Sequence, residues 1–440
     1  MKLTINSAEL NNAINVLSVV NTKVSQPVLE NFLFSHKNGV VRMMSSCGAD
    51  MDACYLLQAT NYEGEGKFCV DGKLLASAVK RLSAQDIVLE VDLDTLEATI
   101  THSYGVIRLK CTSCESYPER ISMPSEAVST MVSFLPFSSS LATCLKGTAT
   151  DETRIVMNGV NLEFHGGHYT LVGTDGRRLY AIKQEAQCID NVSIIVPKAT
   201  AKVIAKCRNA GVANISIGGN YCDIRIDSKI SLRFRGIDGR YPNWRAVIPR
   251  TMTKAITANA NALKASVQRV SNFGDSSSRV LLRVKENNKM VISATNNEYL
   301  FSSEEAISLC DTNMSKYLMG VSAPFLAEIL GMVESENVTI LCENMQKPSL
   351  TRECSDGRTF LTLLMPMKID AKEEGISEED CEEVIAYEQK TTIDDFDLPV
   401  VPAEDTTKQA EPAPANSGAI VVNGVTIAEY SHHDISEEVE

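Results

Sequence analysis

The chain repeats itself with a spacing of about 124 residues, and this repeat constrains the fold more than any other feature of the sequence. The clearest anchors are dipeptides ending in proline, each 124 residues from the next: Tyr117-Pro118, Tyr241-Pro242 and Met365-Pro366. Three further dipeptides recur with nearly the same offset, and each closes a short apolar, strand-like run: Ala49-Asp50, Thr174-Asp175 and Thr295-Asn296. Self-similarity at a fixed period indicates copies of one structural unit. We therefore expect three similar domains, with boundaries at residues 1–122, 123–250 and 251–370.

Each copy shows the same order of patterns, which is helix, strands, helix, strands. Apolar residues at helical spacing predict a first helix near residues 7–20, 138–146 and 261–273. A second amphipathic helix follows a strand end within residues 70–82, 196–207 and 321–330. Alternating β-rich runs, such as Ile87 to Asp92, lie between and after the helices. The sequence thus predicts an α+β fold in which two helices of each copy pack on antiparallel sheet.

Acidic residues are concentrated in the last seventy residues. The formal net charge is −14, but residues 371–440 carry 19 Asp and Glu and 3 Lys, which leaves the first 370 residues near neutral. Residues 371–415 have few large apolar groups and are expected to be disordered. Residues 419–430 alternate around an Asn-Gly pair, which is a hairpin signal; because an isolated hairpin is marginal in water, we expect this one to be ordered only on a partner, if at all. A nucleic-acid partner is compatible with the near-neutral body.

The sequence lacks the usual catalytic motifs. It contains no phosphate-binding P-loop, no GxSxG and no HExxH, and it has only six histidines. Cys111 and Cys114 form a lone CxxC, and His165 and His168 flank a Gly-Gly pair that is more typical of a hairpin turn than of a metal site. We therefore expect no enzyme, metal or cofactor. No apolar run reaches membrane-spanning length, so a cytoplasmic protein that does not enter membranes is expected.

Basic residues recur on the predicted helices of several copies. Lys198, Lys202 and Lys206 are spaced i, i+4, i+8 and share one helix face. For one helix a solvated face is the simpler interpretation, but its recurrence favours a common basic surface. If the helices face one axis, they form a channel that contacts phosphates without reading bases. The candidate DNA-facing residues are Lys23, Lys73, Lys80, Arg81, Lys146, Lys198, Lys202, Lys206, Arg208 and Lys264.

Four motifs, in order and in step with the repeat, resemble the bacterial beta sliding clamp family, the processivity subunit of the replicative DNA polymerase. They are Pro27-Val28-Leu29-Glu30-Asn31-Phe32, Thr174-Asp175-Gly176-Arg177-Arg178-Leu179, Gly239-Arg240-Tyr241-Pro242-Asn243-Trp244-Arg245 and Leu363-Leu364-Met365-Pro366-Met367-Lys368-Ile369. The resemblance covers residues 1 to about 370. It implies three sliding-clamp domains per chain and a head-to-tail homodimer that closes a ring around double-stranded DNA.

The resemblance also implies partners and a pocket for them. The expected partners are a replicative DNA polymerase and a separate clamp loader ATPase, which would use a peptide-binding pocket between domains two and three. The positions that match the family pocket are Met157, Thr174, Gly176, Arg178, Leu179, Pro242, Val247, Phe325, Ser349, Leu363, Met365, Pro366 and Met367. Ala246 stands where the family often has a basic residue and Arg177 where histidine is common, which favours a pocket that is shallower or tuned to a different partner motif.

The resemblance further implies a dimer contact between domain one of one chain and domain three of the next. The matching positions are Leu74, Ala78, Leu82, Ile107 and Leu109 on one side and Val270 with its neighbours on the other. Ile107 and Leu109 alternate on a predicted edge strand, which suits continuation of a sheet between subunits. The alternative function is a three-domain cytosolic scaffold that binds protein segments and does not encircle DNA.

Overall fold

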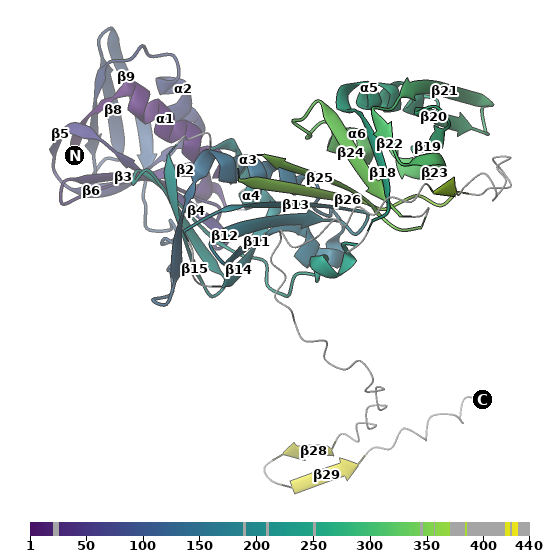
Figure 1. Cartoon of the computed structure of the whole chain (residues 1–440). Coiled ribbons are helices and arrows are strands. Elements are labelled where there is room, and N and C mark those ends of the chain that lie inside the picture. Colours follow the sequence, from purple (N-terminus) through teal and green to yellow (C-terminus); the bar gives the residue numbers. More distant parts are fainter. Residues whose placement is uncertain are drawn as a thin grey trace, which may run out of the picture. The chain divides into compact units, whose positions relative to one another are not determined.

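A computed structural model of the chain describes residues 1–20, 26–187, 191–207, 211–249, 252–343, 346–355 and 357–369, together with the backbone of three short strand segments near the C-terminus. The chain forms two compact units, residues 1–396 and 397–440. The first unit contains three domains with the same order of elements (Figure 1). The expected α+β fold of three repeated domains is therefore confirmed.

The elements of the three domains follow one another as the repeat predicts. Domain one contains β1 (Lys2–Asn6), α1 (Ser7–Leu17), the 3-10 helix η2 (Pro27–Glu30), β2 (Asn31–Lys37), β3 (Val40–Ser46), β4 (Met51–Leu57), β5 (Ala59–Glu63), β6 (Gly66–Asp71), α2 (Gly72–Val79), β7 (Asp86–Asp92), β8 (Glu97–His102) and β9 (Gly105–Thr112). Domain two contains β10 (Val128–Ser133), α3 (Phe134–Leu145), η3 (Glu152–Asn158), β11 (Gly159–His165), β12 (His168–Thr174), β13 (Arg178–Glu185), β14 (Val192–Pro197), α4 (Lys198–Lys206), β15 (Val212–Gly218), β16 (Tyr221–Ile226) and β17 (Ile230–Arg235), followed by η4 (Trp244–Val247). Domain three contains β18 (Lys254–Asn259), α5 (Ala260–Ser271), β19 (Arg279–Lys285), β20 (Lys289–Asn296), β21 (Phe301–Ser308), β22 (Asp311–Thr312), β23 (Met314–Ser322), α6 (Ala323–Leu330), β24 (Asn337–Cys342), β25 (Ser349–Ser355) and β26 (Arg358–Leu364).

Helices α1 and α5 each begin after a strand at an asparagine whose side chain caps the helix. The side chain of Asn6 accepts a hydrogen bond from the Ala8 amide at 3.0 Å, and that of Asn259 accepts one from the Ala262 amide at the same distance. Such caps satisfy amide groups that a helix leaves without intrahelical partners. The two helices of each domain pack together, α1 with α2, α3 with α4 and α5 with α6 (Figure 1).

Strands of neighbouring domains join into continuous antiparallel sheets. At the junction of domains one and two, β4 pairs with β17 from Met51↔Phe234 to Tyr55↔Ile230. At the junction of domains two and three, β13 pairs with β26 from Arg178↔Leu364 to Lys183↔Thr359. The two junctions use equivalent strands, because β4 and β13 each follow a hairpin turn of the repeat and β17 and β26 each end a domain.

Two strands at the ends of the three-domain unit keep an open edge within the described part of the chain. In domain three, β21 pairs with β20 alone, from Lys289↔Ser308 to Asn296↔Phe301. In domain one, β9 pairs with β8 throughout but meets β6 only at residues 111–112. Residues 105–110 therefore present one free side, and the prediction that Ile107 and Leu109 lie on an edge strand is confirmed.

The tail contains little described structure. The prediction of disorder for residues 371–415 is wrong for Glu383–Val384, which form β27 and pair with β23 near Met314 and Lys316. The rest of that segment lies outside the described residues. The predicted hairpin is confirmed, because β28 (Ala419–Val422) pairs with β29 (Val425–Glu429) in the second unit.

Candidate peptide-binding site

The turn between β12 and β13 is held by its own polar side chains. The Thr174 hydroxyl donates to the Arg178 carbonyl at 2.7 Å, and the Asp175 carboxylate accepts from the Arg177 and Arg178 amides at 2.9 and 3.0 Å. Gly176 has φ of 85°, a left-handed conformation that glycine adopts without strain. The Met157 methyl lies 3.9 Å from the place where a Cβ on Gly176 would stand. The turn thus carries little side-chain bulk beside a flexible thioether.

Arg178 ties domain two to domain three at this turn. Its guanidinium lies 3.2 Å from Asp175 and 3.1 Å from Glu328 of α6. It also donates to the carbonyl of Lys146 at 2.7 Å. The ring of Phe325, also on α6, lies under the guanidinium at 4.1 Å from the ring centroid. A planar group with several donors suits such a shared role better than an ammonium would.

A small apolar cluster forms the buried base of this region. Leu179 on β13 is paired with Leu363 on β26, and both pack with Trp244 and Ile248 from the linker that leaves domain two. The Trp244 ring is held by Arg245, whose guanidinium lies 4.2 Å from its centroid. Leu179 and Leu363 are fully buried, so they support the site from below and present no surface to a partner.

The segment after β26 forms backbone hydrogen bonds with both domain two and domain three. The Met365 amide donates to the Arg177 carbonyl at 2.8 Å, and the Met367 amide donates to the Gly320 carbonyl of β23 at 2.8 Å. The Met365 side chain is 39% exposed. Methionine adapts its shape to different neighbours, which suits a surface that receives more than one partner.

The structure brings most of the predicted pocket residues together. Hydrogen bonds, strand pairing or packing connect nine of them: Met157, Thr174, Gly176, Arg178, Leu179, Phe325, Ser349, Leu363 and Met365. Pro242 and Val247 are exposed on the linker, one on each side of the buried Trp244, and Pro366 and Met367 are partly exposed. Thr174, Leu179, Ser349 and Leu363 are buried and so form the frame of the site.

The predicted DNA-facing residues lie mostly exposed on or beside the helices. Lys73, Lys80, Arg81, Lys146, Lys202 and Lys206 are exposed, and Lys264 is partly exposed. Lys146 of domain two and Lys264 of domain three line one depression of about 460 Å³ beside α5 and α6. Burial lowers the pKa of Lys198, and the nearby charges of Lys202 and Arg178 act in the same direction. Lys23 and Arg208 lie outside the described residues.

The predicted turn between His165 and His168 can be checked directly in the structure. His165 and His168 pair across a hairpin whose Gly166 and Gly167 both have positive φ, so the predicted turn is confirmed. Across the described ranges, no group of three or more His, Cys, Asp or Glu side chains could hold a metal ion. In the same part of the chain, no helix is long and apolar enough to cross a membrane.

Comparison with known proteins decides the family. Models of the N-terminal, central and C-terminal domains of the DNA polymerase III beta subunit match residues 1–121, 141–243 and 245–368. The chain belongs to the DNA polymerase III beta subunit family. Among curated relatives, the beta sliding clamp of Haemophilus influenzae is 25% identical over 369 residues, covering 80% of this chain and 96% of the relative. That of Synechococcus elongatus is 27% identical over 331 residues, covering 70% and 84%.

Solved structures of the family share the fold. A sliding clamp of Pseudomonas aeruginosa bound to griselimycin has a TM-score of 0.77 at 20% identity, covering 84% of this chain and all of the other. The beta subunit of Thermotoga maritima has a TM-score of 0.76 at 20% identity with the same coverage. The fold of this chain therefore matches these solved structures over their entire length.

Val270, one of the residues predicted for the dimer contact, lies on the buried face of α5. Its side chain is fully buried, so it is not available to a second chain. Phe273, just beyond the helix, is 47% exposed. On the other side, Leu74 is 56% exposed, while Ala78, Leu82, Ile107 and Leu109 are partly exposed.

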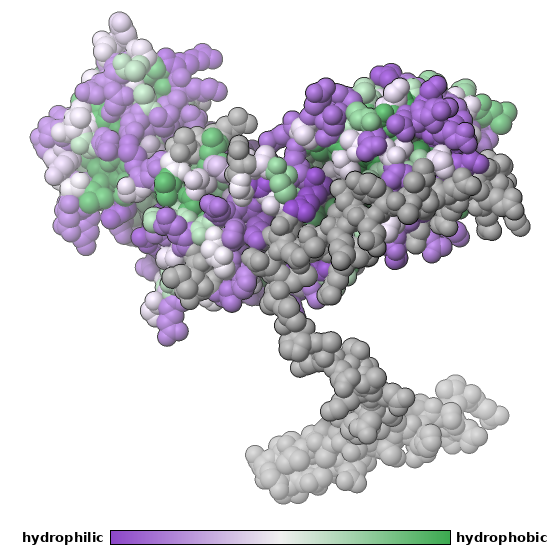
Figure 2. Space-filling model, in the orientation of Figure 1, coloured by the Kyte–Doolittle hydropathy of each residue, from purple (hydrophilic) through white to green (hydrophobic). Residues whose placement is uncertain are grey.

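The sequence reasoning also missed an apolar group beside the open edge of β21. Tyr299, Leu300 and Phe301 are 63%, 89% and 57% exposed, and the rings of Tyr299 and Phe301 stack at 6.3 Å. Figure 2 shows hydrophobic atoms at the end of domain three where Figure 1 labels β20 and β21. The signal was present in the sequence as an apolar run after Asn296-Asn297, but leucine and phenylalanine are more often buried than exposed, so the run gave no reason to expect an apolar surface.

Proposed function

We propose that this chain is a DNA polymerase processivity factor, a sliding clamp that closes a ring around duplex DNA. The observation that carries the proposal is the pairing of equivalent strands at the two junctions, β4 with β17 and β13 with β26. In domain three, the strand equivalent to β4 and β13 is β21, and in domain one, the strand equivalent to β17 and β26 is β9. Both β21 and β9 have an open edge in the described structure. Pairing β21 of one chain with β9 of another would repeat the same junction a third time.

A third junction of the same kind closes a ring when the rotation per domain is a whole fraction of a turn. In this family the ring contains two chains, which places six domains around the hole. The proposed domains are residues 1–122, 123–250 and 251–370. Charge supports the β21 and β9 contact, because Glu298 and Glu304 lie at or beside β21 while β9 carries Arg108 and Lys110.

The basic helix residues give the ring its proposed hold on DNA. Lysines on the exposed faces of α4 and beside α3 contact phosphates without reading sequence. Such contacts are weak and salt-dependent, which permits sliding. A closed ring then keeps a tethered polymerase near the template at high effective concentration. Function at sites of DNA replication implies a cytoplasmic location.

The site around Arg178 and Met365 is the proposed dock for extended segments of the polymerase and of the clamp loader. Its exposed rim combines an adaptable thioether, Val247 and a cationic turn, while the buried frame keeps the rim in place. The chain has no P-loop, so a separate ATPase must open the ring. No catalytic role is proposed.

The ring is tested by electron microscopy and sedimentation of the full chain. We expect closed particles of two chains, and we expect Phe273→Asp to shift the population to monomers because a charge would be buried at the junction. Leu135→Asp on α3 is the matched control, since Leu135 is 45% exposed and lies away from both open edges. Monomers at all concentrations for the unaltered chain, or equal effects of the two variants, would contradict the ring.

The scaffold alternative makes a different prediction about DNA. We expect Lys202→Glu combined with Lys206→Glu to reduce retention on circular DNA after loading, because two phosphate contacts become repulsive. Lys37→Glu with Lys289→Glu is the control of equal charge, since both lysines are exposed at strand ends remote from the helix faces. A pure protein scaffold would show no difference between the two pairs.

A further inference from the structure

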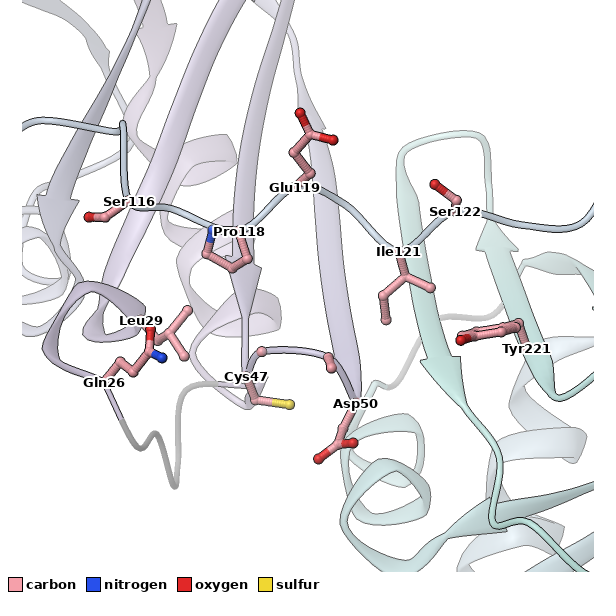
Figure 3. A pocket seen from close by; sticks show the side chains of 12 residues that line it. Gln26, Leu29, Cys47, Asp50, Ser116, Pro118, Glu119, Ile121, Ser122 and Tyr221 are labelled. Carbon is pink, nitrogen blue, oxygen red and sulfur yellow. The ribbon is translucent and has the colours of Figure 1, made fainter. Parts of the chain in front are cut away.

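A second pocket lies at the junction of domains one and two. It has a volume of about 720 Å³ and is lined from both domains (Figure 3). Leu29 and Cys47 reach it from domain one, Tyr221 from the start of β16, and Pro118 and Ile121 from the segment that links the domains. A volume of this size accommodates several side chains of a bound segment.

Each wall of this pocket is the repeat counterpart of a wall of the site around Arg178. Leu29 lies in η2, two residues before β2, as Met157 lies in η3, two residues before β11. The turn at residues 47–50 between β3 and β4 corresponds to the turn between β12 and β13. Pro118 corresponds to Pro242 through the 124-residue repeat, and Tyr221 opens β16 as Ser349 opens β25. The pocket is therefore the same architectural site, formed one junction earlier.

The linker wall of the pocket is fixed before any partner arrives. The Ile121 amide donates to the buried Asp52 carboxylate at 2.8 Å, and the Ile121 carbonyl accepts from Arg233 at 2.8 Å. Arg120 completes the frame through its Nε, 2.8 Å from the other Asp52 oxygen. Because the backbone on both sides of Ile121 is anchored, a segment that binds here need not order the wall first.

The described lining of the first junction pocket is acidic. It contains the carboxylates of Asp50 and Glu119, which are both exposed, and among the described residues that line it there is no lysine or arginine. At the second junction the turn and the linker carry arginines that pair with carboxylates, Arg178 with Asp175 and Glu328, and Arg245 with Glu163. The same geometry with a different distribution of charge selects a different class of partner.

We propose that the pocket at the junction of domains one and two is a second docking site, which binds an extended partner segment carrying an apolar side chain flanked by lysine or arginine. The apolar side chain enters between Leu29, Pro118 and Ile121, and the cations pair with Asp50 and Glu119. Since the two carboxylates are exposed, the charge contribution falls as salt rises. The proposal needs the junction only, and it holds whether or not the chain closes a ring.

Two fluorescein-labelled peptides of equal length test the proposal on the full chain, GKLRLFG and its charge-inverted counterpart GELDLFG. Fluorescence anisotropy measures affinity, and hydrogen exchange reports where each peptide protects the backbone. We expect GKLRLFG to bind at least ten-fold more tightly than GELDLFG at this pocket and to protect residues 47–50 and 116–122. Asp50→Lys with Glu119→Lys should weaken GKLRLFG at least ten-fold.

The control is Asp94→Lys with Glu286→Lys, which adds the same charge on exposed residues of hairpin turns elsewhere. Unchanged exchange in the rest of the chain shows that each variant is folded. The proposal is overturned by absence of GKLRLFG binding, by equal loss in both double variants, or by protection confined to the turn at residues 174–178. Failure of ring formation in the earlier experiment leaves these outcomes unaffected.

Discussion

Replacing Arg178 with alanine tests how strongly one side chain couples domains two and three. The substitution removes the ion pairs with Asp175 and Glu328, the bond to the Lys146 carbonyl and the stack on Phe325. Removing one partner of a buried ion pair costs about 3–5 kcal/mol. The side chain of Glu328 is 31% exposed, so solvent compensates part of that loss, and we expect about 3 kcal/mol.

Differential scanning calorimetry of the full chain measures the effect on the first unfolding transition. At roughly 2–4 °C per kcal/mol, the midpoint should fall by roughly 6–12 °C. Arg177→Ala is the matched control, because Arg177 is the neighbouring residue, has an exposed side chain and contributes its backbone carbonyl to Met365 in either case. Its midpoint should change little, as is usual for exposed positions.

Arg178→Lys separates charge from geometry. Lysine keeps the positive charge but cannot contact two carboxylates and a carbonyl at once while lying flat on a ring, so we expect most of the loss to remain. Full retention of the midpoint by Arg178→Lys would show that charge alone holds the junction. Equal midpoints for Arg178→Ala and Arg177→Ala would refute the reasoning altogether.

Three further predictions follow from contacts elsewhere in the chain. Hydrogen bonds from Arg269 and Ser266 lower the pKa of Glu305 to about 2. The ionised carboxylate therefore contributes stability above its ordinary pKa, and this contribution is lost as the pH falls through about 2. The substitution Arg269→Gln should return the pKa of Glu305 toward its ordinary value, which NMR titration measures. Gly173→Ala should lower the free energy of unfolding by about 3 kcal/mol, because the added Cβ would lie 1.9 Å from a backbone oxygen of α3. Gly105→Ala, whose Cβ would have no heavy atom nearer than 3.8 Å, should lower it far less, and denaturant unfolding of both variants measures the difference. Deleting residues 371–440 removes a net charge of −16 and should tighten DNA association at low salt more than at high salt, and superimposable salt titrations would exclude this role of the tail.

The regular strands and helices were predictable because burial along them follows the period of a strand or of a helix. In β7, Ile87, Leu89 and Val91 are buried and the residues between them are not, as a strand with one face on a core requires. Helix α1 buries Leu10 and Leu17 on one stripe. These patterns depend on local sequence alone, so the repeat could be translated directly into three similar domains.

Positions that depend on helix phase or on contacts between domains were harder to predict from the sequence. The first helix of domain two was expected from residue 138 but begins at Phe134, because Phe134, Phe137 and Leu141 continue the buried stripe through an early proline at Pro136. A proline in the first turn needs no amide partner, so it does not end the helix. The phase of α5 likewise decides that Val270 faces the core, and residue spacing alone did not locate that face.

The pocket between domains two and three was predicted only through the family resemblance, and the pocket between domains one and two was not predicted, because the walls of both come from distant parts of the chain. The same interdomain geometry limits what the ends of the molecule can do. Both inner junctions cover the edges that they join, whereas β21 keeps an open edge beside Leu300, of which 89% is exposed. An exposed edge with large apolar neighbours pairs readily with other strands and invites aggregation. The partner that covers β21 in the same way as the inner junctions is an equivalent of β17 and β26, and within this sequence that strand is β9. A second copy of the chain supplies β9 without leaving a new edge open only if the ring closes, so in the proposed assembly the contact that protects the edge also favours closure over an open chain of copies.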